Sequence, residues 1–328
     1  MQEFNSNLFK ISFFLILFLI PSPSLSKEFS QSFIAWGTNL DFIVHSDLEE
    51  KRVFSVIQNV QRIPGSMELI FNSKNPNSEL SEINTLDSQK KMKISFHLYF
   101  LIDKSIYYNK ISDGYFDITL GGLNYSKSQN PALREGKKCS GLDNLVLDKY
   151  RNTYEESRTI LKKKKCITLD LDGIAEGYVM MLMLAKFKEN GFNEVLINFG
   201  GNVSTLSNKK KWKVSVKNPD FSSDINSTYD LNNLSISTSS QYSKIVEYEN
   251  KTFSHIFDPI RKVFKSKENL SVSVISTNSV YADAMSTAIQ AMPTEKALNF
   301  LKEKEDLKVL ILKKTQDGKI KTLFNNLP

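Results

Sequence analysis

The order of helical and strand-like segments is the feature that most restricts the fold of this 328-residue chain. Apolar residues recur at helical spacing in the stretches 47–63, 92–111, 175–191, 281–292 and 294–304. Short alternating stretches bounded by turns, typical of strands, lie between and after them. Because these segments do not follow the regular strand–helix alternation of a parallel sheet, we predict an α+β fold. Residues 27–328 should form a single compact domain of mixed, largely antiparallel strands with packed helices.

Proline, glycine and serine residues predict where some helices begin and end. Pro64 and Gly65 are expected to end the first helix, and Gly191 the third. The polar stretch 72–84 is expected to be a loop in which Ser78 or Ser81 caps a short turn.

The first 26 residues are predicted to be a secretory signal peptide outside this domain. Residues 11–20, ISFFLILFLI, form an apolar run that is too short to span a bilayer as a mature helix. Lys10 precedes the run, and Ser24-Leu25-Ser26 offers a small-x-small cleavage site. The folded part should therefore lie outside the cytoplasm. An uncleaved membrane anchor is the alternative.

The net charge of +7 does not indicate a nucleic-acid partner. The lysine runs at 161–165 and 208–213 lie just before expected strands and are better explained as solvated turns than as a binding stripe. Export also argues against nucleic acid, whereas a basic surface could attract an anionic small ligand.

The two cysteines, Cys139 and Cys166, leave two alternatives open. They could pair in an oxidising compartment, or they could be two buried thiols. Neither has a metal-ligand companion, so neither is assigned to the chemistry.

The stretch YADAMSTAIQAM, 281–292, places a carboxylate and a hydroxyl one helical turn apart, at Asp283 and Thr287. The pair could be a helix cap with an incidental hydroxyl. Their neighbours are small or apolar, however, and a buried Asp needs a partner. A hard cation such as Mg²⁺, bound through oxygen ligands, would satisfy both groups.

Two further segments carry polar residues beside glycines. In SDGYFDITLGGL, 112–123, Asp117 and Thr119 alternate with apolar residues before a glycine pair, although a plain hairpin would show the same pattern. In LDLDGIAEGYVM, 169–180, the strand ITLDLD is expected to lead through a glycine turn into a helix that starts near Ile174. The free amides at such a helix start suit phosphates.

The segment FSHIFDP, 253–259, places one of the three histidines of the chain, His255, near the carboxylate of Asp258. A carboxylate beside a histidine is the usual arrangement for orienting a base. A purely structural histidine is the alternative.

Taken in order, these segments resemble one family, the ApbE-type FAD:protein FMN transferases. The resemblance covers nearly all of the chain after residue 36. It is carried by GT at 37–38, SELSEIN at 78–84, SDGYFDIT at 112–119, DGIAEGY at 172–178, NFGGNV at 198–203, SISTSSQY at 235–242, HIFDP at 255–259 and DAMST at 283–287.

The resemblance implies an exported, periplasmic enzyme that cleaves FAD at its pyrophosphate. Such an enzyme attaches FMN through a phosphoester bond to a Thr or Ser of a target protein and releases AMP. The implied target is a subunit of a membrane redox complex, and the enzyme itself could be associated with the inner membrane. The implied Mg²⁺ site consists of Asp283, Thr287 and the backbone carbonyl of Ala175.

The resemblance also assigns the flavin-binding residues, which are Tyr115, Phe116, Asp117, Glu176, Thr238 and Ser239. It places His255 and Asp258 near the phosphates. His255 is the candidate base that takes the proton of the acceptor hydroxyl, and Asp258 is the second candidate.

The chain departs from the family pattern at several positions. Ser240 and Lys262 stand where the family usually has glycine, Gly122 replaces the Pro of "GPL", Glu176 stands where many members have Lys, and Met181 stands where an Asp is common. A lost glycine can move a loop by more than catalysis tolerates. A flavin-binding protein without transferase activity is therefore one alternative, and an FAD pyrophosphatase that yields FMN and AMP is another.

Overall fold

The structure is a computed structural model that describes residues 26–121, 139–151, 156–218, 225–240, 245–248, 251–254, 256–265 and 270–327. All but the last residue of the predicted signal peptide lie outside these ranges, and so does His255. None of the helices in the described ranges is long and apolar enough to cross a membrane.

The described helices are α1 (Glu50–Val60), α2 (Ile63–Phe71), α3 (Glu79–Thr85), α4 (Phe96–Ile111), η2 (Leu142–Asn144), α7 (Ala175–Glu189), α8 (Ser279–Ala291) and α9 (Thr294–Lys302). The strands of the first half are β1 (Lys27–Ala35), β2 (Thr38–Ser46), β3 (Lys91–Lys93), β4 (Leu145–Arg151), β5 (Glu156–Lys162), β6 (Val195–Phe199) and β7 (Asn202–Leu206). Those of the second half are β8 (Trp212–Lys217), β9 (Ile225–Leu231), β10 (Ser235–Ser240), β11 (Ile245–Tyr248), β12 (Lys251–Ser254), β13 (Phe257–Asp258), β14 (Val263–Phe264), β15 (Leu270–Ser276), β16 (Lys308–Lys314) and β17 (Ile320–Asn325).

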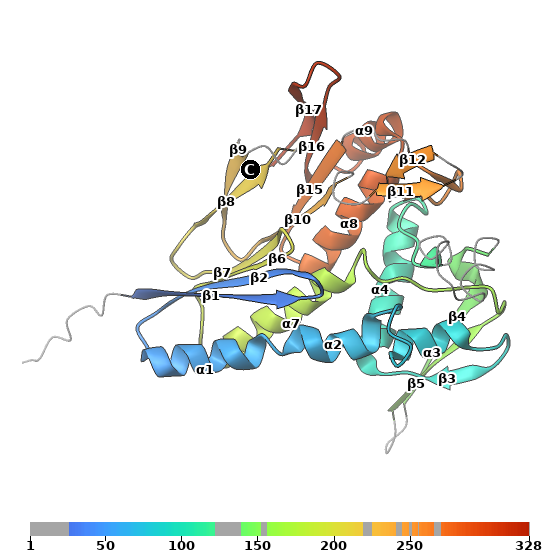
Figure 1. Cartoon of the computed structure of the whole chain (residues 1–328), viewed down its shortest axis with the longest axis horizontal. Helices are drawn as coiled ribbons and strands as arrows, with labels where there is room; N and C mark the ends of the chain where they lie inside the picture. The colour runs from blue at the N-terminus through green and yellow to red at the C-terminus, as the bar shows by residue number, and fades with distance from the viewer. Residues whose placement is uncertain are drawn as a thin grey trace, which may run out of the picture.

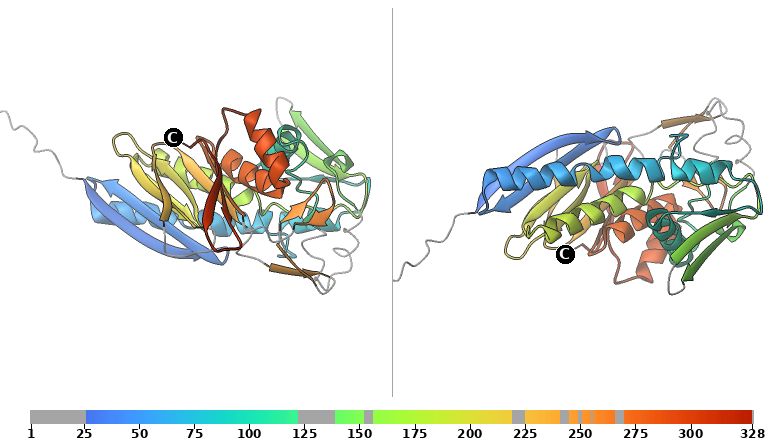
Figure 2. Two further views of the ribbon diagram at one scale, coloured as in Figure 1. Left: turned by 90° about the horizontal axis from the view of Figure 1, so that it is seen from above. Right: turned by 90° about the horizontal axis from the view of Figure 1, so that it is seen from below.

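An eight-stranded sheet in the order β1-β2-β6-β7-β10-β15-β16-β17 forms the centre of the molecule. Every strand pair in this sheet is antiparallel. Helices α7 and α8 lie side by side against one face of the sheet (Figure 1). Seen from below, α1 and α2 form a row outside α7, which adds a further helical layer (Figure 2).

Side chains alternate across this sheet, so that it has a core on both faces. On β6, Val195, Ile197 and Phe199 pack with the helices, whereas Leu196 packs on the other face against the β8–β9 hairpin. Burial on both faces explains why β6 has a nearly continuous run of apolar residues. The predicted α+β class, with largely antiparallel strands and packed helices in one compact fold, is confirmed.

One predicted helix boundary and one predicted strand are wrong. Pro64 and Gly65 do not end helical structure, because α2 begins at Ile63 and takes Pro64 into its first turn. Proline is favoured there, since the first helical amides need no partner within the helix. The segment 167–172 is not a strand, and only an isolated parallel bridge between Leu120 and Thr168 forms there.

Other local predictions are confirmed. The Ser78 side chain caps α3 by accepting a hydrogen bond from the Ser81 amide at 3.1 Å. Gly191 follows α7 with φ +83°, as a helix-ending glycine should. Cys139 and Cys166 form a disulfide, which decides between the two alternatives that the sequence left open.

Candidate active site

One cavity of about 1160 Å³ gathers most of the predicted site residues. It lies beside the start of α7, the end of β10 and the second turn of α8, and the loop after α4 closes another side. The predicted residues that line it are Tyr115, Phe116, Asp117, Glu176, Thr238, Ser239, Asp283 and Thr287. The structure therefore brings together residues that are up to 172 positions apart in the chain.

The α8 helix is fixed at its start by Asn278. The Asn278 side-chain oxygen accepts hydrogen bonds from the amides of Val280 and Tyr281 at 3.0 and 3.2 Å. This cap sets the first turn of the helix. Asp283 and Thr287 then follow one turn apart on the side that lines the cavity.

Helices α7 and α8 are in close contact at Gly177. A β-carbon on Gly177 would stand 2.4 Å from the Ser279 carbonyl oxygen and 2.8 Å from the Asp283 β-carbon. Two hydrogen bonds cross this contact, from the Gly177 amide to Asp283 Oδ2 at 2.8 Å and from Ser279 Oγ to the Gly177 carbonyl at 2.6 Å. The glycine therefore allows α7 to hold the carboxylate of α8 directly.

The Asp283 carboxyl is 6% exposed, and burial raises its pKa to about 7. The negative charge of Asp172 raises the pKa further, whereas the hydrogen bond from Gly177 lowers it. Burial disfavours the charged form because the carboxylate loses its hydration. A bound cation would offset that loss.

Hydroxyl groups surround the next turn of α8. Ser239 Oγ lies 2.9 Å from Ser286 Oγ and 3.3 Å from Thr287 Oγ1. A β-carbon on Gly173 would stand 3.1 Å from Thr287 Oγ1, so the glycine keeps the space beside this hydroxyl clear.

This donor set fits a hard divalent cation. It contains only oxygen atoms, with one carboxylate, and Mg²⁺ prefers oxygen ligands and keeps several waters. Within the described ranges, no group of three or more His, Cys, Asp and Glu side chains is arranged to hold a metal. Mg²⁺ at Asp283 and Thr287 would therefore need further oxygen atoms from the backbone, water or a phosphate.

Hydrogen bonds of Asn202, on β7, connect α7 with β10 along another side of the cavity. Asn202 Nδ2 donates to Glu176 Oε2 at 2.8 Å, and Asn202 Oδ1 accepts from the Thr238 amide at 3.1 Å. The Thr238 hydroxyl lies 2.8 Å from Ser273 Oγ on the neighbouring strand β15. These contacts fix the positions of Glu176 and Thr238 along the cavity.

The aromatic side of the cavity follows α4. Tyr115 and Phe116 are buried, and the Phe116 backbone is held by Ser112 and Asn109 through hydrogen bonds of 3.0 and 2.8 Å. Next to them, Asp117 Oδ1 accepts from the Thr119 amide at 2.8 Å and from the Thr119 hydroxyl at 2.6 Å.

Burial raises the pKa of Asp117, whereas the two hydrogen bonds from Thr119 and the positive charge of Lys262 lower it. Two aromatic rings beside a carboxylate suit a flat heterocycle that donates a hydrogen bond.

Two predicted residues lie behind the cavity lining. Ala175 is the buried first residue of α7, and its carbonyl belongs to the helix start. Asp258 is 2% exposed, and its Oδ1 accepts hydrogen bonds from the amides of Ile260 and Arg261, both at 2.9 Å. The Asp258 carboxylate thus organises the turn between β13 and β14.

Several site residues were not singled out from the sequence. Asn202 stood within the quoted NFGGNV, Ser286 within DAMST and Gly173 within DGIAEGY. Their roles depend on contacts between α7, β10 and α8, which have no local sequence pattern. A polar residue directly after a glycine turn is the one signal that could have pointed to Asn202.

Comparison with known proteins identifies the family. The sequence profile of the ApbE family matches residues 36–311. The chain belongs to the ApbE family. A relative from Chlamydia muridarum, named FAD:protein FMN transferase, is 29% identical over 264 residues, which are 75% of this chain and 78% of the relative. A protein of the same name from Klebsiella pneumoniae is 25% identical and covers 89% of this chain and 91% of its own length.

Solved structures of ApbE proteins share the fold. The flavin transferase ApbE from Vibrio cholerae superimposes with a TM-score of 0.74 at 19% identity, over 90% of this chain and 97% of that one. The ApbE protein of Thermotoga maritima gives 0.76 at 21% identity, with the same coverage.

One departure from the ApbE pattern has a structural explanation. Lys262 has φ +57°, the left-handed conformation that favours the glycine expected at this position. Its amide donates to the Asp258 carbonyl at 2.8 Å, which closes the turn with Lys262 in this conformation.

Proposed function

We propose that this ApbE-family protein is an FAD:protein FMN transferase. It cleaves FAD at the pyrophosphate, transfers FMN to a Thr or Ser hydroxyl of a target protein, and releases AMP. The observation that carries the proposal is one cavity with oxygen ligands at Asp283 and Thr287 on one side and the Tyr115–Phe116 pair on another. The names of the curated relatives support the same reaction class.

In this reaction the acceptor oxygen forms a bond to the FMN phosphorus, and the bond from that phosphorus to the bridging oxygen breaks. AMP takes the bridging oxygen, and the acceptor hydroxyl loses its proton. Catalysis of phosphoryl transfer depends mainly on positioning and on electrostatic stabilisation. The hydrogen bonds from Asn202 to Glu176 and from the Gly177 amide to Asp283 hold both carboxylate side chains in fixed positions along the cavity.

Asp283 and Thr287 would hold Mg²⁺, with the Ala175 carbonyl as the third ligand that the family pattern implies. When bound, Mg²⁺ neutralises negative charge on the phosphates and on the leaving group. Asp283 is held for this role by the Gly177 amide, and Thr287 by its contact with Ser239.

The base that receives the acceptor proton is proposed to be His255. The turn-forming contacts of Asp258 support this choice over Asp258 itself. A His255→Ala variant should transfer FMN at least about 100-fold more slowly, within the usual range for general-base catalysis. A normal rate in this variant would remove His255 from the mechanism.

The test combines the purified protein with FAD, MgCl₂ and an acceptor protein that carries a flavinylation-competent Thr. Covalent flavin fluorescence on the acceptor after denaturing electrophoresis supports the transferase. Release of AMP without an acceptor would favour the pyrophosphatase, and neither product would favour simple flavin binding. Asp283→Asn should abolish transfer, whereas Asp103→Asn on the exposed side of α4 should leave it unchanged.

We further propose that the protein is exported and acts in the periplasm, where its target is a subunit of a membrane redox complex. The Cys139–Cys166 disulfide supports an oxidising compartment. N-terminal sequencing of the mature protein checks the signal peptide, which should be cleaved after Ser26. An intact N-terminus in the membrane fraction would instead indicate an anchor.

A further inference from the structure

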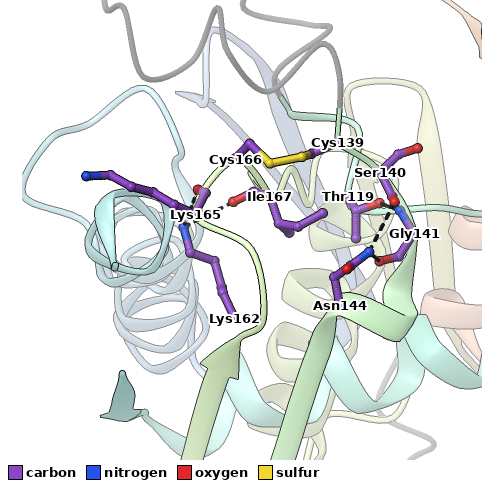
Figure 3. The surroundings of a disulfide bond; sticks show 9 residues. All are labelled: Thr119, Cys139, Ser140, Gly141, Asn144, Lys162, Lys165, Cys166 and Ile167. Carbon is purple, nitrogen blue, oxygen red and sulfur yellow. Dashed lines mark hydrogen bonds between the residues drawn. A yellow bond between two sulfur atoms is a disulfide. The ribbon is translucent and has the colours of Figure 1, made fainter. Parts of the chain in front are cut away.

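The short segment 117–121, which carries Asp117 into the cavity, is held from two sides by parts of the chain that are distant in sequence. One is the segment 139–141, and the other is the segment 166–170 (Figure 3). The disulfide between Cys139 and Cys166 connects these two supports to each other.

The first support acts through Thr119, which is fully buried. The Gly141 amide donates to Thr119 Oγ1 at 2.7 Å, and this hydroxyl donates to Asp117 Oδ1 at 2.6 Å. The hydroxyl proton is committed to the carboxylate because the amide already supplies a proton to the same oxygen. Both hydrogen bonds from Thr119 end on Oδ1, so they fix the orientation of the carboxylate.

The second support holds the backbone around Asp117. The Asp170 amide donates to the Ile118 carbonyl at 2.8 Å, and the Gly121 amide donates to the Thr168 carbonyl at 3.1 Å. This support is itself fixed by Lys162, whose buried ammonium group donates to the Ile167 carbonyl at 3.1 Å.

Within the described part of the chain, segment 139–141 is also held by the turn that follows it, and Cys139 packs against the core. Asn144 Nδ2 donates to the carbonyls of Ser140 and Gly141 at 3.3 and 3.0 Å, and the Asn144 carbonyl accepts from the Lys163 amide at 2.8 Å, which joins this turn to the end of β5. The disulfide adds a covalent link between segment 139–141 and the second support, on the side where Gly141 lies against Thr119 (Figure 3).

We propose that Thr119 is a positioning residue for Asp117 in FAD binding, and that the Cys139–Cys166 disulfide maintains this position. Asp117 accepts a hydrogen bond from an N–H or O–H group of FAD, and it binds strongly only while Thr119 and Gly141 orient it. This inference rests on the proposed function, because it takes FAD as the ligand of the cavity.

Reduction of the disulfide should therefore weaken FAD binding. A dithiol such as dithiothreitol supplies two electrons and two protons to the S–S bond, which becomes two thiols, and the dithiol closes to its own cyclic disulfide. Both cysteines are partly exposed, so the bond is accessible to a small reductant.

The test measures the dissociation constant of FAD by quenching of flavin fluorescence, in EDTA so that FAD is not consumed. Thr119→Val keeps the side-chain shape but removes the hydroxyl, and it should raise the dissociation constant about tenfold. Thr119→Ser keeps the hydroxyl and should bind nearly as wild type does. A loss in Thr119→Val that Thr119→Ser does not restore would overturn the proposal, since a packing role alone would give that pattern.

The disulfide is tested with a Cys139→Ser/Cys166→Ser double variant, with and without dithiothreitol. We expect the wild type in dithiothreitol and the double variant to bind FAD several-fold more weakly than the oxidised wild type. Dithiothreitol should not change the affinity of the double variant. Circular dichroism and thermal melting confirm that each protein is folded under the conditions of the titration.

Two failures can be told apart. Equal affinity in the oxidised and reduced wild type, with normal FMN transfer, would refute this inference alone. A wild type that binds no FAD would contradict the proposed function as well.

Discussion

Gly177→Ala adds only one methyl group, yet the structure predicts a large loss of stability. The added β-carbon would meet the Ser279 carbonyl oxygen at 2.4 Å, well inside the 3.0 Å below which something must shift. The obstacle is backbone in α8 and cannot rotate away. Helices α7 and α8 must therefore move apart by at least about 0.6 Å at this point.

Three contributions decide the magnitude. Overpacking of a tight contact costs about 1–3 kcal/mol. Loss of the hydrogen bond from the Gly177 amide to the buried Asp283 carboxylate adds about 1.5–3 kcal/mol. The higher helix propensity of alanine returns only about 1 kcal/mol. We expect a net loss of about 1.5–5 kcal/mol in the free energy of unfolding.

The assay is urea unfolding followed by circular dichroism, together with thermal melting. For a domain of this size the loss corresponds to a melting temperature that is about 2–8 °C lower. Gly65→Ala is the matched control, because Gly65 also lies in a helix but a β-carbon there meets nothing within 4 Å. It should be neutral or stabilising by up to about 1 kcal/mol. Equal stabilities for the two variants would refute the close-contact argument.

Three further predictions concern the site. The affinity for Mg²⁺, measured by calorimetry, should fall as the pH falls from 8 to 6, by up to about tenfold per pH unit below pH 7. The reason is that the Asp283 carboxyl must lose its proton when the metal binds, and a pH-independent affinity would contradict this. Lys262→Gly should raise the free energy of unfolding by about 1 kcal/mol in urea titrations, because a lysine at φ +57° is strained and a glycine is not. A loss of stability in this variant would contradict the strain at Lys262. Asn278→Ala should lower the unfolding free energy by about 1–2 kcal/mol and Asn278→Asp much less, because only the aspartate keeps the cap of α8; equal losses would argue against a capping role.

Most of the secondary structure could be predicted from local sequence patterns. Apolar periodicity found α1 and α4 because each helix buries one stripe of side chains. It also found α7, although this helix is buried on most sides in its first two turns. The α2 helix was missed because a proline ends one helix and starts another equally well, and only packing against α7 decides which. The segment 167–172 was mistaken for a strand because its apolar residues pack in the core without a ladder partner.

The sequence by itself determined which residue types would form the site. The spacing of Asp283 and Thr287 within one helix requires that they share a face, whatever the rest of the fold. The family resemblance, carried by the ordered motifs, implied that Tyr115, Asp117 and Glu176 belong to the same site and supplied their roles.

Only the tertiary structure decided how these groups are held. The Gly177 contact, the Asn202 bridge and the link from the disulfide through Thr119 to Asp117 each join segments that lie far apart in the chain. Such contacts produce no periodic pattern in the sequence, because each depends on the distance between two elements and not on the residue spacing within either element. Local sequence segments therefore determined which functional groups the site contains, whereas the packing of α7 and α8 on one sheet determined how these groups are arranged.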